Sequence, residues 1–391
     1  MAGTTQKAPP AAKKGTPVAR RPFTAGTRAI DRTYYDQSRT FSASSQKYDP
    51  WDIGSSGFFS GAYLLMECVT AGNSAAVAFT ANGPWSAIDI VQLNDVQSQP
   101  MLGPMTGWDL YIVNKYGGYG FQNDPRMWGQ YFALTGAGAT GGSFSFSLRI
   151  PVEIVKRDAL GTLPNKNNAA SFKVEVTLAP TASVYSVAPT AAGAVRLRFQ
   201  LFGYDDPSDV DLKGNAVSQN PPAVNTTQYW QKQTYPVNAG SLNLRLQGID
   251  ALVRGLVFVL TDGSSSRSVG DTSFPDPFTI KYEGKEILNR FKTIWQQQIS
   301  EQYGYGRAPG GALTAVVAPE AAGARDLGVY PWMFHTDFTT APGAETRLTY
   351  LPVSSATSIE LTGTLGNAGT LTVLVNKIVP ANGNPMALTG R

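Results

Sequence analysis

The stretch SFSFSLRI, residues 143–150, carries the pattern from which the architecture of this chain can be worked out. Phe, Leu and Ile occupy every second position, and Ser or Arg stands at each position between them. Because successive side chains of a β-strand point to opposite faces, this alternation predicts a strand with one buried and one wet face. FKVEVTL (172–178), VRLRFQL (195–201) and LNLRL (242–246) repeat the alternation. The body of the chain is therefore expected to consist of β-strands.

The composition agrees with a β-rich globular protein. Gly and Pro supply 40 and 26 of the 391 residues, only 15% of residues are charged, and 18 Phe, 17 Tyr and 7 Trp can fill a core. These figures exclude a coiled coil and a fully disordered chain, and the length suits about two domains. Less regular apolar runs, separated by Asn-Gly and Asp-Gly turns, predict further strands at 58–69, 75–79, 88–93, 256–260, 279–282, 348–351, 359–361 and 371–378.

Two segments depart from the strand pattern and predict helices. Residues 285–303 contain no Gly or Pro, and their apolar residues recur at helical spacing up to Tyr303, where Gly304 follows. Residues 105–116 show a shorter pattern of the same kind, which ends before Gly117. Near the N-terminus, Ile30 and Tyr34 are spaced i, i+4 and suggest a short helix over residues 27–37.

The two main helices belong to segments that resemble each other. Trp108 precedes Tyr116-Gly117 by the same spacing as Trp295 precedes Tyr303-Gly304. Each helix follows a strand that contains Ile and a polar turn, and each is followed by a Gly- and Ala-rich stretch and then by Pro151 or Pro331 beside an apolar strand. This order predicts a tandem duplication of one β unit. Eight short strands with long connections are typical of a jelly roll, so the chain is expected to be all-β, with two eight-stranded jelly rolls that each carry a helical insertion.

The expected domains are a flexible N-terminal arm (1–47), a first jelly roll (48–235) and a second (236–391), with long loops at 205–227 and 304–328. The first 40 residues hold only two acids but eight basic residues, and the remainder is near neutral, with 24 basic and 26 acidic groups. A cationic arm favours an anionic partner, either lipid headgroups or nucleic acid. A solvated tail is the simpler alternative, and in either case deletion of 1–39 is expected to leave the body folded. The candidate residues are Lys7, Lys13, Lys14, Arg20, Arg21, Arg28, Arg32 and Arg39.

Several kinds of chemistry find little support in the sequence. Cys68 is the only cysteine and His335 the only histidine, which excludes an intrachain disulfide and most zinc and iron sites. The most apolar run, 252–260, is too short to span a membrane and contains Arg254. The N-terminus lacks the apolar region of a secretory signal, so we expect a protein made in the cytoplasm, where it stays or is released by lysis.

No motif assigns a catalytic, cofactor or metal site. The acidic run 205–215 resembles a calcium loop, but Lys213 occupies a ligand position and Asn220 stands where the bidentate Glu is needed. Asp271-Thr272-Ser273 matches the short signature of aspartic proteases, yet the sequence holds no second copy to supply the paired aspartate. A polar surface loop and a turn before a strand are the preferred interpretations.

The residues together resemble a known family, the double jelly-roll major capsid proteins of tailless icosahedral bacteriophages with an internal membrane (tectivirus-like). The resemblance extends from about residue 41 to 380. It rests on Tyr48-Asp49-Pro50, Gly83-Pro84, Gly107-Trp108-Asp109-Leu110 and Gly328-Val329-Tyr330, on the Ala- and Gly-rich turn 137–142, and on the duplicated order of the segments.

The resemblance implies a structural subunit of a virion shell, without cofactors. Three chains with two similar barrels each would form a pseudo-hexagonal homotrimer that contacts neighbouring capsomers and minor capsid and vertex proteins. The arm would face internal membrane lipids or the genome. Two other hypotheses stay open at this stage: a minor receptor- or glycan-binding spike protein on a β-sandwich, and a hydrolase that depends on Asp271.

Overall fold

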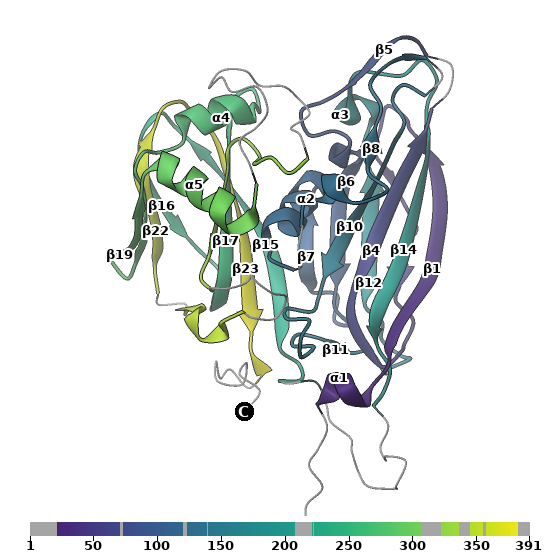
Figure 1. Ribbon diagram of the computed structural model, residues 1–391, viewed down its shortest axis with the longest axis horizontal. Coiled ribbons are helices and arrows are strands. Elements are labelled where there is room, and N and C mark those ends of the chain that lie inside the picture. The colour runs from purple at the N-terminus through teal and green to yellow at the C-terminus, as the bar shows by residue number, and fades with distance from the viewer. Residues whose placement is uncertain are drawn as a thin grey trace, which may run out of the picture.

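The computed structural model describes residues 22–70, 73–119, 123–138, 140–207, 221, 223–305, 322–335, 345–354 and 357–381. These residues fold into two β-rich units that lie side by side, with helix α2 (Gly107–Tyr116) between them (Figure 1). Helix α1 (Phe23–Gly26) and the end of strand β23 (Gly369–Val379) lie at one end of the molecule, and helices α3 (Thr181–Val184) and α4 (Arg267–Ser273) lie near the other. No helix in the described ranges is both long and apolar enough to cross a membrane.

The first unit consists of two facing sheets. One has the strand order β1-β14-β4-β10, and the other has the order β2-β12-β6-β7. Smaller strands border them: β8 (Phe132–Ala133) beside β10, β11 (Leu163–Pro164) beside β4, and β3 (Trp51–Asp52) beside β12. The eight strands are β1 (Ala29–Thr40), β2 (Gln46–Lys47), β4 (Phe58–Val69), β6 (Ile88–Asn94), β7 (Pro100–Met105), β10 (Phe144–Pro151), β12 (Lys173–Leu178) and β14 (Ala194–Tyr204). A separate small sheet has the order β13-β5-β9, formed by β13 (Tyr185–Val187), β5 (Asn73–Phe79) and β9 (Gly136–Gly138).

The second unit repeats this arrangement. Its sheets have the orders β15-β23-β17-β20 and β16-β22-β18-β19, and β21 (Leu351–Val353) pairs with β17. Helix α5 (Lys292–Tyr303) follows β19, just as α2 follows β7 in the first unit. The strands are β15 (Thr227–Val237), β16 (Gly240–Leu246), β17 (Ala251–Asp262), β18 (Phe278–Tyr282), β19 (Lys285–Arg290), β20 (Val329–Met333), β22 (Ile359–Leu365) and β23 (Gly369–Val379).

The two units correspond strand for strand. The corresponding strands, in chain order, are β1 and β15, β2 and β16, β4 and β17, β6 and β18, β7 and β19, β10 and β20, β12 and β22, and β14 and β23. Each strand has the corresponding neighbours within its unit's sheets. The predicted fold, two tandem jelly rolls with one helical insertion each, is therefore confirmed. The units are also joined directly, since β15 pairs in parallel with β7 and so extends the first unit's sheet into the second unit.

The alternating strands build the core as their pattern predicts. Phe144, Phe146, Leu148 and Ile150 of β10 are fully buried, and so are the inward residues of β14. The predicted wet face of residues 143–150 is wrong, because Ser145 and Ser147 are buried as well. The loop before β10 covers that face: Gln130 donates a hydrogen bond to Ser147, and β8 pairs with β10.

Two helix predictions need correction. Residues 285–290 form strand β19, and only 292–303 form the predicted helix, as α5. The turn at Glu283-Gly284 has positive φ at both residues, which suits a tight hairpin and pairs β19 with β18. The helix expected over 27–37 is likewise a strand, β1, because pairing along β14 outweighs the weak i, i+4 signal.

The first strand of each unit precedes the bounds expected from the sequence. Strands β1 and β2 lie before residue 48 and pair with β14 and β12 of the first unit. Strand β15 begins at Thr227, ahead of residue 236, and pairs along β23. Both first strands lack the clean alternation that marks β10. Sequence patterning alone therefore begins the first unit two strands late and the second unit one strand late. Residues 29–40 and 46–47 of the predicted arm are consequently part of the sheets of the first unit.

Candidate functional site at the junction of the two units

Helix α2 occupies the centre of the junction between the two units. The Thr106 side chain caps it by accepting a hydrogen bond from the Asp109 backbone N–H at 3.2 Å, and the Asp109 carboxylate accepts one from the Thr106 backbone N–H at 2.9 Å. All ten residues of α2 are buried, including Asp109, Asn114 and Lys115. A short helix with charged residues is buried on every side only because both units cover it.

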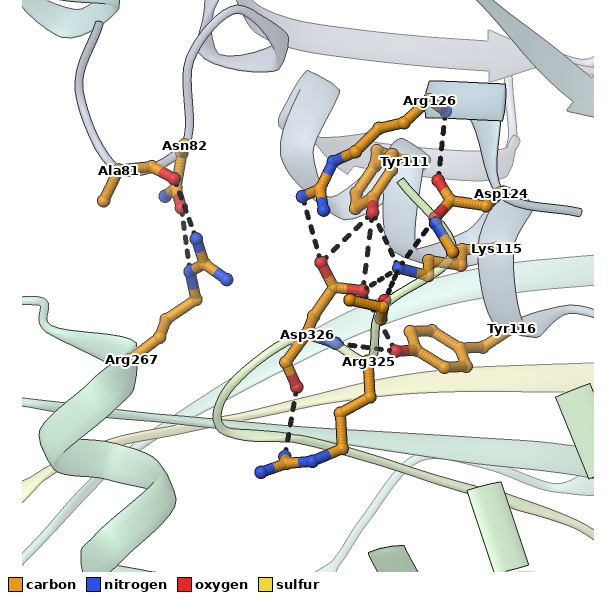
Figure 2. A network of polar contacts seen from close by, with 12 residues as sticks. Ala81, Asn82, Tyr111, Lys115, Tyr116, Asp124, Arg126, Arg267, Arg325 and Asp326 are labelled. Carbon is orange, nitrogen blue, oxygen red and sulfur yellow. Dashed lines mark hydrogen bonds and ion pairs between the residues drawn. The ribbon is translucent and has the colours of Figure 1, made fainter. Parts of the chain in front are cut away.

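Lys115 is the centre of a buried charge network (Figure 2). Its Nζ lies 3.1 Å from Asp124 Oδ2 and 2.8 Å from Asp326 Oδ2, and all three side chains are 0% exposed. Arg126 adds a second cation, 3.1 Å from Asp326 Oδ1. Two cations thus balance two carboxylates, and Asp326 belongs to the second unit whereas the other three residues belong to the first. Charges removed from water need such partners, so this network links the units in a defined geometry.

Tyrosine hydroxyl groups complete the hydrogen bonding of Asp326. Tyr111 donates to Oδ1 at 3.1 Å, and Tyr116 donates to Oδ2 at 3.0 Å while it accepts from the Asp326 backbone N–H at 3.1 Å. Burial raises the pKa of both tyrosines well above the ordinary value, so both phenols stay protonated as donors. The Lys115 ammonium also lies 4.7 Å from the centre of the Tyr305 ring, which comes from the second unit.

A second buried network centres on Arg254 of β17. Its guanidinium donates to both carboxylate oxygens of Glu345, at 2.7 and 2.9 Å, and to the backbone oxygen of Gly117 in the first unit at 2.7 Å. Burial by itself would raise the pKa of Glu345, but the charge and hydrogen bonds of Arg254 outweigh it and lower this pKa to about 2. His335 is buried in the same place, with Nε2 3.6 Å from Glu345 Oε1.

Two further cations of the second unit reach the first unit. Arg267 of α4 donates to Asn82 Oδ1 at 3.1 Å and to the Ala81 backbone oxygen at 2.8 Å (Figure 2), and its guanidinium lies 4.0 Å from the centre of the Trp108 ring. Lys232 of β15 lies 2.6 Å from Asp109 Oδ2. The junction is therefore closed by specific polar contacts along the whole of α2.

Asp271, the residue singled out by the protease-like signature, has an evident structural role. Arg325 donates to both of its carboxylate oxygens at 2.8 Å, and the Gly328 backbone N–H and the Tyr330 hydroxyl also donate to it, at 3.0 and 2.8 Å. Burial opposes ionisation, but Arg325 outweighs it and lowers the pKa of Asp271. Within the described ranges, no group of His, Cys, Asp and Glu is arranged to hold a metal ion.

The basic residues of the predicted arm fall into two sets. Arg28 lies just before β1 and is exposed, Arg32 lies on β1 and is exposed, and Arg39 approaches Asp49 to 3.5 Å. Lys7, Lys13, Lys14, Arg20 and Arg21 lie outside the described residues, as does most of the acidic run 205–215 and the loop 306–321. Three of the eight residues therefore lie at or on the first strand of the first unit.

The junction residues were not selected from the sequence as functional. Arg254 carries a signal, because it is a cation within the otherwise apolar run 252–260, whereas the segment of Lys115 also holds Asp109 and Asn114. Their partners Asp326 and Glu345 lie in loops without regular patterning. Charge within an apolar run could therefore have indicated a buried ion pair, but not its partner.

Two jelly rolls of the same strand order, joined through β7 and β15, define this chain as a double jelly-roll protein. No protein-family model and no curated protein matches the sequence. Among solved structures, the chain is similar to the capsid of the virus PBCV-1, with a TM-score of 0.59 and 12% identity over 93% of this chain and 96% of that one. It is also similar to the major capsid protein of STIV, the Sulfolobus turreted icosahedral virus. There the TM-score is 0.58 and the identity 13%, over 90% of this chain and 97% of that one. At these identities, the likeness establishes the fold.

Proposed function

We propose that this protein is the major capsid protein of an icosahedral virus, and that it assembles as a homotrimer in the virion shell. The observation that carries the proposal is the duplicated unit: two jelly rolls with the same sheet order are held together by the buried Lys115–Asp326 ion pair and by the hydrogen bond from Arg254 to Gly117. Three such chains present six similar units around a threefold axis, which makes a nearly hexagonal block. Blocks of this shape can tile a flat facet.

The buried networks support this role because a tile must keep its shape. The Lys115 and Arg254 networks both reach from one unit to the other. A change in the angle between the units would therefore leave the buried charges of Lys115 and Asp326 without partners and would break the Arg254 bond to Gly117. The low content of charged residues, 15%, also suits a protein that covers much of its surface with copies of itself. Neighbouring capsomers and minor capsid and vertex proteins are the partners of such a shell.

The N-terminal segment is proposed to contact an anionic layer inside the shell, either membrane lipid or genome. Its charge supports this, since Lys7, Lys13, Lys14, Arg20 and Arg21 all precede the described residues. Helix α1, the first described element, lies at one end of the molecule rather than between the units (Figure 1). The chain would be made in the host cytoplasm and reside in the virion.

The proposal is tested by the mass and the assembly of the purified protein. Light scattering is expected to give three times the mass of one chain, and electron microscopy of particles is expected to show facets of hexagonal blocks. A protein that stays monomeric at high concentration and forms no such blocks would contradict a shell role. A copy number of only a few per particle would favour the minor spike protein instead.

The arm is tested separately with a variant that lacks residues 1–21. It is expected to remain a trimer and to lose binding to vesicles that contain anionic lipid, with neutral vesicles as the control. Retained vesicle binding would contradict the lipid contact, and binding to DNA that is lost with the same residues would assign the arm to the genome.

A further inference from the structure

Helices α2 and α5 occupy corresponding places in the two units but differ in burial. Each follows the last strand of its sheet, and Trp108 and Trp295 stand at the same distance from the Tyr-Gly end of their helices. All ten residues of α2 are buried, whereas only Trp295 and Ile299 are buried in α5. Phe291 and Ile294, at the start of α5, are 60% and 47% exposed. Large apolar side chains exposed next to each other indicate a surface that another protein covers.

The cause of the difference lies in what covers α2. The second unit lies over that helix through the segment 322–328, where Asp326 bonds to Lys115, and through Arg267 above Trp108. The corresponding side of α5 has no such cover among the described residues, where Phe291 and Ile294 are exposed. A ring of six similar units would supply one, because each second unit would have the first unit of the next chain as its neighbour.

We propose that the contact between the two units within one chain is repeated between chains, with α5 and β19 of one chain packed against the first unit of the next. This inference rests on the proposed homotrimer and identifies the surfaces that form it. Strand β19 would face β1 of the next chain, as β7 faces β15 within the chain; β19 and β1 are both edge strands of their sheets.

Three features support this assignment, two of the first unit and one of α5 itself. The segment that covers α2 lies between α5 and β20, and its counterpart in the first unit lies between α2 and β10, over residues 123–138. That counterpart exposes three large apolar side chains, Met127, Phe132 and Leu134, with Met127 49% exposed. The surface that should cover α5 is thus itself apolar and uncovered.

The outward face of the first unit's sheet provides the second feature. Within the chain, the backbone after α2 packs on the outward face of the second unit, where Arg254 of β17 bonds to Gly117 and Gln228 of β15 bonds to Tyr119. The corresponding face in the first unit, formed by β14, β4 and β10, holds an open groove of about 570 Å³. The groove is lined by Tyr63, Leu65, Trp128, Gln130, Ser147 and Arg198, among others. The end of α5 from the preceding chain would lie at this groove, as the end of α2 lies on the second unit.

The third feature is the chemistry of α5. If the two tryptophans are taken as equivalent, Asp109, Tyr111 and Lys115 of α2 correspond to Gln296, Gln298 and Gln302 of α5. Neutral amides can enter an interface between chains without the cost of desolvating charge, which suits subunits that must first exist apart. Gln298 Oε1 is buried and has no hydrogen-bond partner among the described residues, so it is available to a donor from the next chain.

The test compares Ile294→Asp with Leu348→Asp as a matched control. Leu348 is 64% exposed and lies in the short helix η3 (Arg347–Thr349), outside both proposed surfaces. In light scattering, Ile294→Asp is expected to shift from the mass of three chains to that of one, with an unchanged far-ultraviolet circular dichroism spectrum. Leu348→Asp is expected to remain a trimer. If Ile294→Asp also remains a trimer, the proposed interface is wrong although the trimer stands. A monomeric wild-type protein would instead contradict the proposed function.

A second measurement decides the case in which Ile294→Asp fails to fold. A chain carrying both Ile294→Cys and Phe132→Cys is treated with a bismaleimide, and the products are separated on a denaturing gel. Bands of two and three chains are expected from the double variant, and only single-chain bands from each single variant. The native Cys68 is fully buried and should not react. Absence of the larger bands from the double variant would overturn the assignment.

Discussion

Replacement of Lys115 by Met provides the sharpest test of how the two units are held together. The substitution keeps most of the side-chain volume but removes the ammonium group, which lies 3.1 Å from Asp124 and 2.8 Å from Asp326. Only Arg126 then remains to compensate two buried carboxylates. Removal of one partner from a buried ion pair costs about 3–5 kcal/mol, because the other charge is left in a medium of low polarity.

The expected cost translates into a measurable shift of melting temperature. The entropy of unfolding is about 2.1 cal/mol/K per residue. For a chain of 391 residues, the free energy of unfolding near the melting temperature therefore falls by about 0.8 kcal/mol for each degree of warming. A loss of 3–5 kcal/mol therefore lowers the melting temperature by about 4–6 °C. The matched control is Lys47→Met: Lys47 lies 2.7 Å from Glu175, a similar distance, but its side chain is 55% exposed. An exposed pair contributes about 0–1 kcal/mol, so the control should shift by about 1 °C or less.

Differential scanning calorimetry of the three proteins at neutral pH decides the matter. Equal melting temperatures for Lys115→Met and the wild-type protein would refute the argument that this network holds the units together. The double variant Lys115→Met/Asp326→Leu adds an internal check. It removes one cation and one anion together, leaves Asp124 beside Arg126, and should melt above the single variant.

Three further predictions concern other parts of the fold. The pKa of Glu345 is lowered from 4.5 to about 2. Its contribution to the free energy of unfolding is therefore complete above pH 4.5 and is lost as the pH falls towards 2. At 1.36 kcal/mol per pKa unit, this contribution amounts to about 3 kcal/mol. When the melting temperature is measured from pH 4.5 down to pH 2, it should fall less steeply for Glu345→Gln than for the wild-type protein. Gly270→Ala would place a Cβ 1.9 Å from the Leu260 backbone oxygen and should cost about 1–3 kcal/mol in thermal unfolding, whereas Gly263→Ala meets no atom within 4 Å and should be neutral. Deletion of residues 1–40 removes β1, which pairs with β14 from Ala29 opposite Tyr204 to Thr40 opposite Ala194, and should yield insoluble protein. Deletion of residues 1–21 should leave the melting temperature unchanged. Soluble, folded protein after the longer deletion would contradict the role of β1.

The corrected view of the N-terminal segment follows from the last of these predictions. Sequence reasoning treated residues 1–39 as an appendage, because their composition is basic and rich in small residues. The structure places β1 at the edge of the β1-β14-β4-β10 sheet, where it covers one side of β14. An edge strand pairs on one side only, so its sequence does not have to alternate as that of a central strand does.

Local periodicity was sufficient to predict the architecture. The alternation in residues 143–150 and 195–201 predicted strands β10 and β14, and the equal spacing from Trp108 and Trp295 to their Tyr-Gly ends predicted the duplication. These signals survive in a single sequence because a strand or helix must present its apolar residues at a fixed period whatever it later packs against.

The contacts that join the two units had no such signal. Tyr116 and Asp326 are 210 residues apart, and nothing in the spacing of either indicates the other. Residues 285–290 likewise became a strand through a hairpin with β18, although their sequence continues the helical pattern of α5. Partner choice between distant segments depends on which faces the folded chain brings together. Only the tertiary structure could therefore show that Lys115 with Asp326, and Arg254 with the Gly117 backbone, connect one jelly roll to the other.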